Sequence, residues 1–177
     1  TLNRLVNLGA NKTKDVLGFN PKKILNEIKD LVVKQEKRFD HLYENVIIPQ
    51  LEENKIFIIN EKQLNVERGA FVREYFRREV LPNLVPIMLD IQNPDWIFPS
   101  LSDQRIYLFV KLTFKKKAKY ALVQVPPKLS RFLVLPENRG MKFIILLDDI
   151  IRYCLDDLFF LFDFDQIEAY SIQLTRD

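Results

Sequence analysis

The chain has 177 residues, of which 47% are hydrophobic and 29% charged, and 27 Lys and Arg against 24 Asp and Glu give it a formal net charge of +3. This composition excludes a disordered chain and allows one domain, or one domain with a small appendage, around a core. No apolar run approaches the ~18 residues of a membrane span. We expect a soluble, cytoplasmic protein, cut from something longer because the chain starts at Thr1 without an initiator Met.

The scarcest residue types restrict the chemistry. Cys154 is the only cysteine, which excludes an internal disulfide, and its apolar helical surroundings predict a buried thiol rather than a nucleophile. His41 is the only histidine, and its helical spacing predicts a place on a helix surface. The four glycines are too far apart to form a phosphate-binding loop of the P-loop or dinucleotide type.

The first 54 residues predict helices. An apolar stripe followed by a polar stretch indicates the end of a helix and a connector within residues 1–19. Asn20-Pro21 is a start signal, because Asn can cap free amides and Pro needs no donor there. From Ile24 to Val46, apolar residues recur every three or four positions, which predicts a long helix that needs partners in a helical bundle. Pro49 should kink or end it near residues 47–48.

From residue 55 the pattern predicts a mixed α/β unit with a mainly antiparallel sheet, so the predicted fold class is α+β, a long N-terminal helix followed by this unit. Residues 65–80 predict a helix with Phe71, Val72, Tyr75 and Phe76 facing inward. A second helix should run from Asp148 to about residue 160. The expected strands cover 55–59, 105–114, 120–125, 131–135, 143–147 and 167–175, with turns at 115–117 and 136–140. The predicted domains are 1–54 and 55–177.

Charge is distributed unevenly along the chain. Residues 1–54 carry a net charge of +1, residues 55–142 carry +8, and residues 143–177 carry −6. One interpretation is a stand-alone module whose basic segment 55–142 binds a polyanion, either polyphosphate or nucleic acid. The alternative is that the basic and acidic blocks face each other or are solvated. The candidate polyanion contacts are Arg73, Arg77 and Arg78 on one helix and Lys115, Lys116 and Lys117 at a hairpin tip.

Two further patterns have functional and structural interpretations. Tyr107 and Phe109 beside Arg105 could stack on bases, but a second packed sheet face explains them as well, so nucleic acid is the less favoured polyanion. Four aspartates could hold a metal ion in an unrelated enzyme, although solvated acidic residues at a helix start explain them without one. These four are Asp148, Asp149, Asp156 and Asp157.

Several ordered motifs resemble the N-terminal half of polyphosphate kinase of the histidine-phosphorylating type. The matching pieces are Ile47-Ile48-Pro49-Gln50-Leu51-Glu52-Glu53, Tyr75-Phe76, Val80-Leu81-Pro82-Asn83-Leu84-Val85-Pro86, Phe98-Pro99-Ser100-Leu101-Ser102-Asp103, Val125-Pro126-Pro127 with Leu129-Ser130-Arg131-Phe132, Leu147-Asp148-Asp149-Ile150-Ile151 and Thr175-Arg176-Asp177. The chain departs from the family pattern at Lys55, Val85, Asp103 and Gln173. No catalytic role is carried over to those positions.

The resemblance implies a piece of a larger enzyme, with residues 1–54 as the end of its helical N-terminal domain and 55–177 as its head domain. In that family the phosphorylated histidine and most ATP and magnesium ligands belong to two C-terminal domains. His41 matches neither family histidine. We therefore expect no catalytic, cofactor or metal residue in this chain, which should be inert on its own. The expected partners are the remaining domains of the parent kinase and a second copy, in a homodimer formed through the head domain, with polyphosphate a further candidate.

Overall fold

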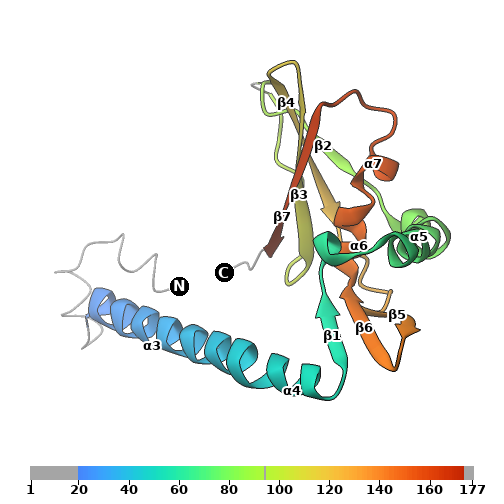
Figure 1. The fold of residues 1–177 in the computed structure, drawn as a ribbon. Coiled ribbons are helices and arrows are strands. Elements are labelled where there is room, and N and C mark those ends of the chain that lie inside the picture. The colour runs from blue at the N-terminus through green and yellow to red at the C-terminus, as the bar shows by residue number, and fades with distance from the viewer. Residues whose placement is uncertain (1–19, 94, 174–177) are drawn as a thin grey trace. The chain divides into compact units, whose positions relative to one another are not determined.

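The computed structural model describes residues 20–93 and 95–173, and it divides them into two compact units between Asn54 and Lys55 (Figure 1). The first unit contains one long helix, and the second contains two sheets with short helices around them. Antiparallel pairs predominate in the sheets, so the predicted α+β fold class is confirmed. The helix end and connector predicted within residues 1–19 lie outside the described residues.

Helix α3 (Pro21–Leu42) begins where the sequence indicates. The Asn20 side chain accepts hydrogen bonds from the amides of Lys22 and Lys23, and Pro21 occupies the first turn, where a missing donor costs nothing. Many apolar side chains of this helix and the next turns are exposed in their own unit, in keeping with the predicted need for partners. They include Ile28, Leu31, Val32, Phe39, Leu42 and Ile47.

Pro49 interrupts the helical pattern but does not end the helix. A π-helical turn (Tyr43–Ile47) follows α3, and α4 (Ile48–Glu53) then continues through the proline. The wider turn lets the Ile48 amide bond to the Tyr43 carbonyl five residues back. A π-turn just before a proline relieves the crowding and the lost hydrogen bond, so the chain stays helical to Glu53.

The second unit contains two sheets. The three-stranded sheet has the order β1-β6-β5, with β1 (Ile56–Ile59) parallel to β6 (Met141–Leu146) and β5 (Phe132–Asn138) antiparallel to β6. The four-stranded antiparallel sheet has the order β2-β4-β3-β7. Its strands are β2 (Ile87–Leu89), β3 (Ile106–Phe114), β4 (Lys117–Gln124) and β7 (Gln166–Gln173). The sequence gives no alternating pattern for β2, which is only three residues long.

The turns of the β3–β4 and β5–β6 hairpins contain residues with positive φ angles, which most residue types avoid. Lys115 and Lys116 have φ of 44° and 67°, and Arg139 and Gly140 have φ of 50° and 75°. Two successive positive φ angles are typical of the two-residue turns that match the twist of antiparallel strands. The β3–β4 hairpin was predicted with the Lys115–Lys117 turn. The turn predicted at 136–140 is wrong in extent, because β5 continues through Pro136 to Asn138 across an irregular register.

Helix α5 (Val66–Tyr75) and a π-turn (Phe76–Val80) form the predicted helix, capped by the Asn65 side chain. Val72 and Phe76 are completely buried, whereas Phe71 is 36% exposed and does not face inward as expected. The predicted helix from Asp148 to 160 is instead two short ones, α6 (Leu147–Tyr153) and α7 (Leu155–Leu158). The break falls at Cys154, whose φ of −111° is not helical.

Two cores hold the second unit together. The larger lies among α5, α6, α7 and one face of each sheet, and it contains Phe76, Leu108, Ile145, Ile150 and Phe159. The smaller contains Leu89, Leu101, Tyr107 and Leu122, with Trp96, Phe109 and Tyr120 packed against it. Tyr107 and Phe109 therefore line a second packed face, as the structural interpretation predicted. Among the described residues, no helix is long and apolar enough to cross a membrane.

Candidate functional site

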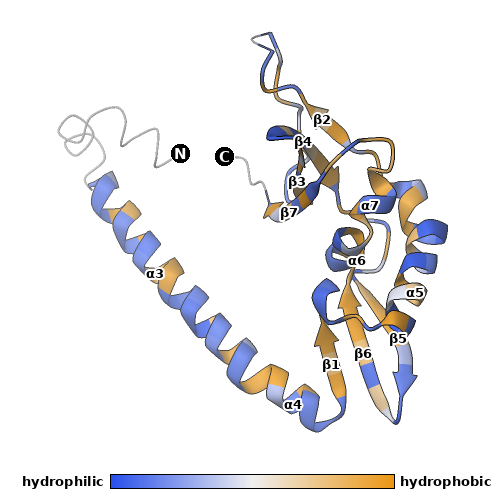
Figure 2. Cartoon of the chain, turned by 45° about the horizontal axis from the view of Figure 1, so that its top comes forward, coloured by the Kyte–Doolittle hydropathy of each residue, from blue (hydrophilic) through white to orange (hydrophobic). Residues whose placement is uncertain are grey.

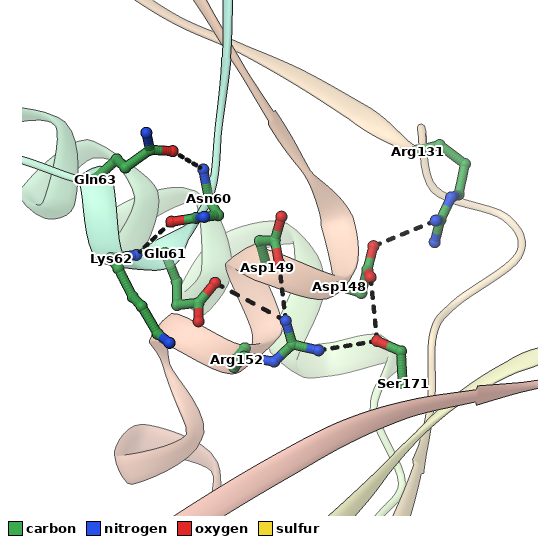
Figure 3. A network of polar contacts seen from close by, with 9 residues as sticks. All are labelled: Asn60, Glu61, Lys62, Gln63, Arg131, Asp148, Asp149, Arg152 and Ser171. Carbon is green, nitrogen blue, oxygen red and sulfur yellow. Dashed lines mark hydrogen bonds and ion pairs between the residues drawn. The ribbon is translucent and has the colours of Figure 1, made fainter. Parts of the chain in front are cut away.

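A network of carboxylates and guanidinium groups joins four segments of the second unit (Figure 3). Arg152 on α6 lies at its centre. Its Nη1 donates to Asp149 Oδ1 at 3.0 Å and lies 3.8 Å from Glu61 Oε2, while its Nη2 donates to Ser171 Oγ on β7 at 2.8 Å. Asp148 accepts from Ser171 at 3.4 Å and pairs with Arg131 Nη2 at 3.2 Å. The network thus links the turn after β1 to α6, β7 and the start of β5.

Asp149 is the one charged residue that is buried among the residues that the structure describes, with 8% of its surface exposed. Burial and the neighbouring carboxylates of Asp148 and Glu61 together raise the pKa of its carboxyl to about 6, against the opposing effect of Arg152. Three carboxylates therefore share two guanidinium groups. A proton on Asp149 near pH 6 would relieve this imbalance.

The predicted arginine contacts are brought together on α5 and the π-turn, but carboxylates occupy them. Arg73 Nη1 donates to Asp157 Oδ2 at 2.8 Å, and Arg77 Nη2 donates to Asp157 Oδ1 at 2.9 Å. Burial tends to lower the pKa of Arg73, but the negative charges of Asp157 and Asp156 outweigh the effect of burial, and the pKa is raised overall. A hollow of about 500 Å³ lies over this helix, lined by Ala70, Arg73, Glu74, Arg77 and Arg78. A phosphate entering it would have to compete with α7 for these cations.

The other candidates are exposed. Arg78 Nε donates to Glu79 at 2.9 Å and its Nη1 lies 3.5 Å from Glu74, so it too is compensated. Lys115, Lys116 and Lys117 are at the tip of the β3–β4 hairpin, and they make no ion pair within the described residues. The tip is fixed by Asp165, which accepts from the Lys115 amide at 2.8 Å. The structure therefore separates the six candidates into a compensated arginine set and an uncompensated lysine set.

The two acidic pairs do not form a metal site. Asp148 and Asp149 pair with Arg131 and Arg152, whereas Asp156 and Asp157 pair with Arg73. No group of three or more metal-ligating side chains occurs among residues 20–93 and 95–173. These four carboxylates, each compensated by a guanidinium group, therefore do not fit a magnesium ion.

Neither scarce nucleophile lies in a reactive setting. Cys154 is buried in the main core, and burial raises the pKa of its thiol to about 12, so the thiol is protonated at neutral pH. His41 is exposed on α3, where its Nδ1 lies 3.2 Å from Asn45 Nδ2. Both sequence predictions are confirmed: a buried thiol and a histidine on a helix surface.

Sequence reasoning found the acidic helix start but missed what pairs with it. Asp148 and Asp149 were identified as acids in the first turn of a helix, and both are there. Their partners Arg131 and Glu61 could be recognised only through the fold, because each is distant in sequence from the aspartate it approaches. Arg152 lies three residues after Asp149 on the same helix, so local helical spacing was a signal for that pair. The opposite charges of the two blocks were the available signal. Cross-block pairs such as Arg77–Asp157 and Lys111–Glu168 show that the blocks do face each other locally.

A family model described as the polyphosphate kinase middle domain matches residues 67–177. A polyphosphate kinase from Vibrio vulnificus (strain YJ016) is 39% identical over 160 residues, which is 88% of this chain and 22% of that protein. The polyphosphate kinase of Escherichia coli (strain K12) is 40% identical over 159 residues, 87% of this chain and 22% of that protein.

The fold has a match among solved structures as well. The crystal structure of polyphosphate kinase from Porphyromonas gingivalis aligns with a TM-score of 0.75 and 28% identity, over 87% of this chain and 26% of that chain. The chain thus spans 22% of the length of the curated relatives described above. With more than half of its residues in the family model, the chain belongs to the polyphosphate kinase family.

Proposed function

We propose that these residues are the non-catalytic part of a polyphosphate kinase that reversibly transfers the γ-phosphoryl group of ATP to long-chain polyphosphate. Residues 1–54 form the end of its N-terminal helical domain, and residues 55–177 form its head domain. The observation that carries the proposal is the match of residues 67–177 to the middle domain of that family. The phosphohistidine, and the binding of ATP and magnesium, belong to other domains of the parent.

The chemistry of the described residues supports a structural role. Phosphoryl transfer needs a nucleophile and cations aimed at the transferring group. Here the thiol is buried and protonated, His41 is on an exposed helix, and Arg73 and Arg77 are paired with Asp157. This part of the parent provides scaffolding and dimer contacts through its head domain.

The direct test is autophosphorylation. The 177-residue chain, incubated with radiolabelled ATP and magnesium, should form no acid-labile phosphohistidine, while the full-length parent should form it under the same conditions. His41→Gln is the matched control in the full-length protein, where it should leave the label unchanged. Labelling of the short chain that disappears with His41→Gln would overturn the proposal.

A second function, polyanion binding by the basic segment 55–142, is favoured by the three uncompensated lysines of the hairpin tip. Polyphosphate would then bind with a steep salt dependence, because each neutralised phosphate releases counterions. Replacing Lys115, Lys116 and Lys117 by Ser should weaken binding at low salt and reduce the salt slope, whereas Arg78→Gln should do neither. If the chain shows no binding at low salt, this function is excluded.

A further inference from the structure

The three-stranded sheet has two apolar faces. Alternate residues of a strand point to opposite faces, and paired residues share one. The inner face packs on the main core through Phe57, Ile59, Leu133, Leu135, Phe143 and Ile145. The register places Ile58, Ile144 and Val134 in one row of the other face and Leu146 and Phe132 in the next. We call this second set, together with Ile56, the outer face.

Within the described residues of this unit, the outer face is only partly covered: Ile56, Ile58, Ile144 and Leu146 are half-buried. None of its six members belongs to either core or packs against one. Val134 is 61% exposed and Phe132 is 56% exposed. In Figure 2, β1 and β6 are coloured as hydrophobic along most of their length. A sheet with one solvated face alternates apolar and polar residues, whereas continuous apolar strands are typical of sheets covered on both sides.

The charges beside the outer face are mainly positive. Lys142 is in the row next to Ile144, opposite Ile56, and its amide bonds to the Lys55 carbonyl at 2.8 Å. Arg139 lies in the turn at the same end of β6. These three cations make no ion pair among the residues that the structure describes, and Glu137 is the carboxylate of β5. A second copy that docked with the same ends together would set this positive end against another positive end, whereas an acidic segment complements it.

We propose that the outer face binds an amphipathic segment, with an apolar stripe flanked by acidic residues, from the part of the full-length kinase outside these 177 residues. This inference rests on the proposed function. The relatives are long enough to contain such a segment elsewhere in their sequences, since this chain covers only 22% of their length. The apolar rows of the outer face would contact the apolar stripe of the segment. Lys55, Arg139 and Lys142 would pair with the acidic residues that flank this stripe.

Cysteine alkylation tests whether the face is covered. Val134→Cys is nearly isosteric and exposed, and the native Cys154 is buried, so the new thiol can be followed by mass spectrometry of its own peptide. We expect alkylation at least tenfold slower in the full-length protein than in the 177-residue chain. Val66→Cys is the control, since Val66 is 92% exposed on α5, and it should react at similar rates in both proteins. Equal rates at position 134 would overturn the proposal.

Two further measurements identify the partner. Carbodiimide coupling in the full-length protein should join Lys142 to Asp or Glu residues outside residues 1–177, at a yield independent of protein concentration. If position 134 instead becomes protected in the short chain as its concentration rises, the partner is a second copy and the proposal is wrong. Kinase activity is assayed separately, so its absence would count against the proposed function without changing the alkylation result.

Discussion

The guanidinium of Arg152 is shared between two carboxylates, Asp149 at 3.0 Å and Glu61 at 3.8 Å, both measured from the same nitrogen, Nη1. This nitrogen joins α6 to the turn that follows β1. Removing Arg152 would leave the buried carboxylate of Asp149 without its guanidinium partner, which is costly in a protein interior. The pair therefore fixes the position of α6 against β1 and makes that position sensitive to protonation.

The first prediction concerns pH. Asp149 ionises with a pKa of about 6 in the folded chain, above the ordinary value of 3.8, so the folded state binds this proton more tightly than the unfolded state. Its contribution to the free energy of unfolding is therefore greatest below pH 3.8 and is lost as the pH rises through 6. The difference corresponds to roughly 3 kcal/mol. Asp149→Asn should remove this loss, with unfolding followed by fluorescence of Trp96, the single tryptophan.

The control for this prediction is Asp163→Asn, since Asp163 is exposed. The difference in unfolding free energy between Asp149→Asn and the natural chain should grow in favour of the variant from pH 4 to pH 7. The difference in unfolding free energy between Asp163→Asn and the natural chain should not change over this pH range. A flat profile for Asp149→Asn would show that the folded state does not hold this proton.

The second prediction concerns the carboxylate that compensates α5. Asp157 bonds to both Arg73 and Arg77 and is 19% exposed in its side chain, whereas Asp156 is 59% exposed and lies 3.6 Å from Arg73. Asp157→Asn should cost about 1–3 kcal/mol of stability, leave Arg77 without its carboxylate and leave Arg73 with Asp156 alone. Polyphosphate binding at low salt should then increase. Asp156→Asn should change stability by less than about 1 kcal/mol.

The outcome separates the two interpretations of the basic segment. If Asp157→Asn leaves polyphosphate binding unchanged while stability falls, Arg73 and Arg77 serve only to hold α7. Titrations of the natural chain and of both variants, at two salt concentrations and at a temperature where all three are folded, provide the comparison.

The third prediction concerns the contact of α5 with α6. Gly69 is buried, and a Cβ built on it would collide with the hydroxyl of Tyr153. Alanine normally stabilises a helix interior by about 1 kcal/mol relative to glycine. Here overpacking should outweigh that gain, because Arg73 lies over the Tyr153 ring at 5.3 Å and the ring packs on the main core. Gly69→Ala should therefore destabilise by about 1–2 kcal/mol in thermal or denaturant unfolding.

A double variant locates the cause of this effect. Tyr153→Phe removes the colliding oxygen, so Gly69→Ala should cost less in the Tyr153→Phe background than in the natural chain. Equal costs in both backgrounds would mean that the glycine is needed for its backbone and that the hydroxyl is not the obstacle.

Local signals in the sequence were sufficient for most elements and insufficient for most contacts. The Asn20 cap, the β3–β4 hairpin and the burial of Cys154 follow from short-range patterns, and the structure confirms them. The break at Cys154 and the length of β5 could not be predicted, because tertiary packing overrides propensity there. The Arg77–Asp157 pair joins distant segments that only the fold brings together, and charge counts alone left open whether it forms.

The fourth prediction uses the hairpin turn. Lys115 and Lys116 occupy the two positive-φ positions of the turn. Asn and Gly are preferred at such positions because they adopt left-handed backbone with little strain. Lys115→Asn with Lys116→Gly should raise the free energy of unfolding by about 0.5–2 kcal/mol. Lys117→Asn should bring no such gain, since Lys117 is already in β4 with ordinary backbone. The Asp165→Ala variant should lower stability by about 1 kcal/mol, because the Lys115 amide loses its acceptor. If Asn-Gly does not stabilise the chain, then Asp165 already offsets the strain of the turn, and the Asn-Gly substitution should become stabilising in the Asp165→Ala background.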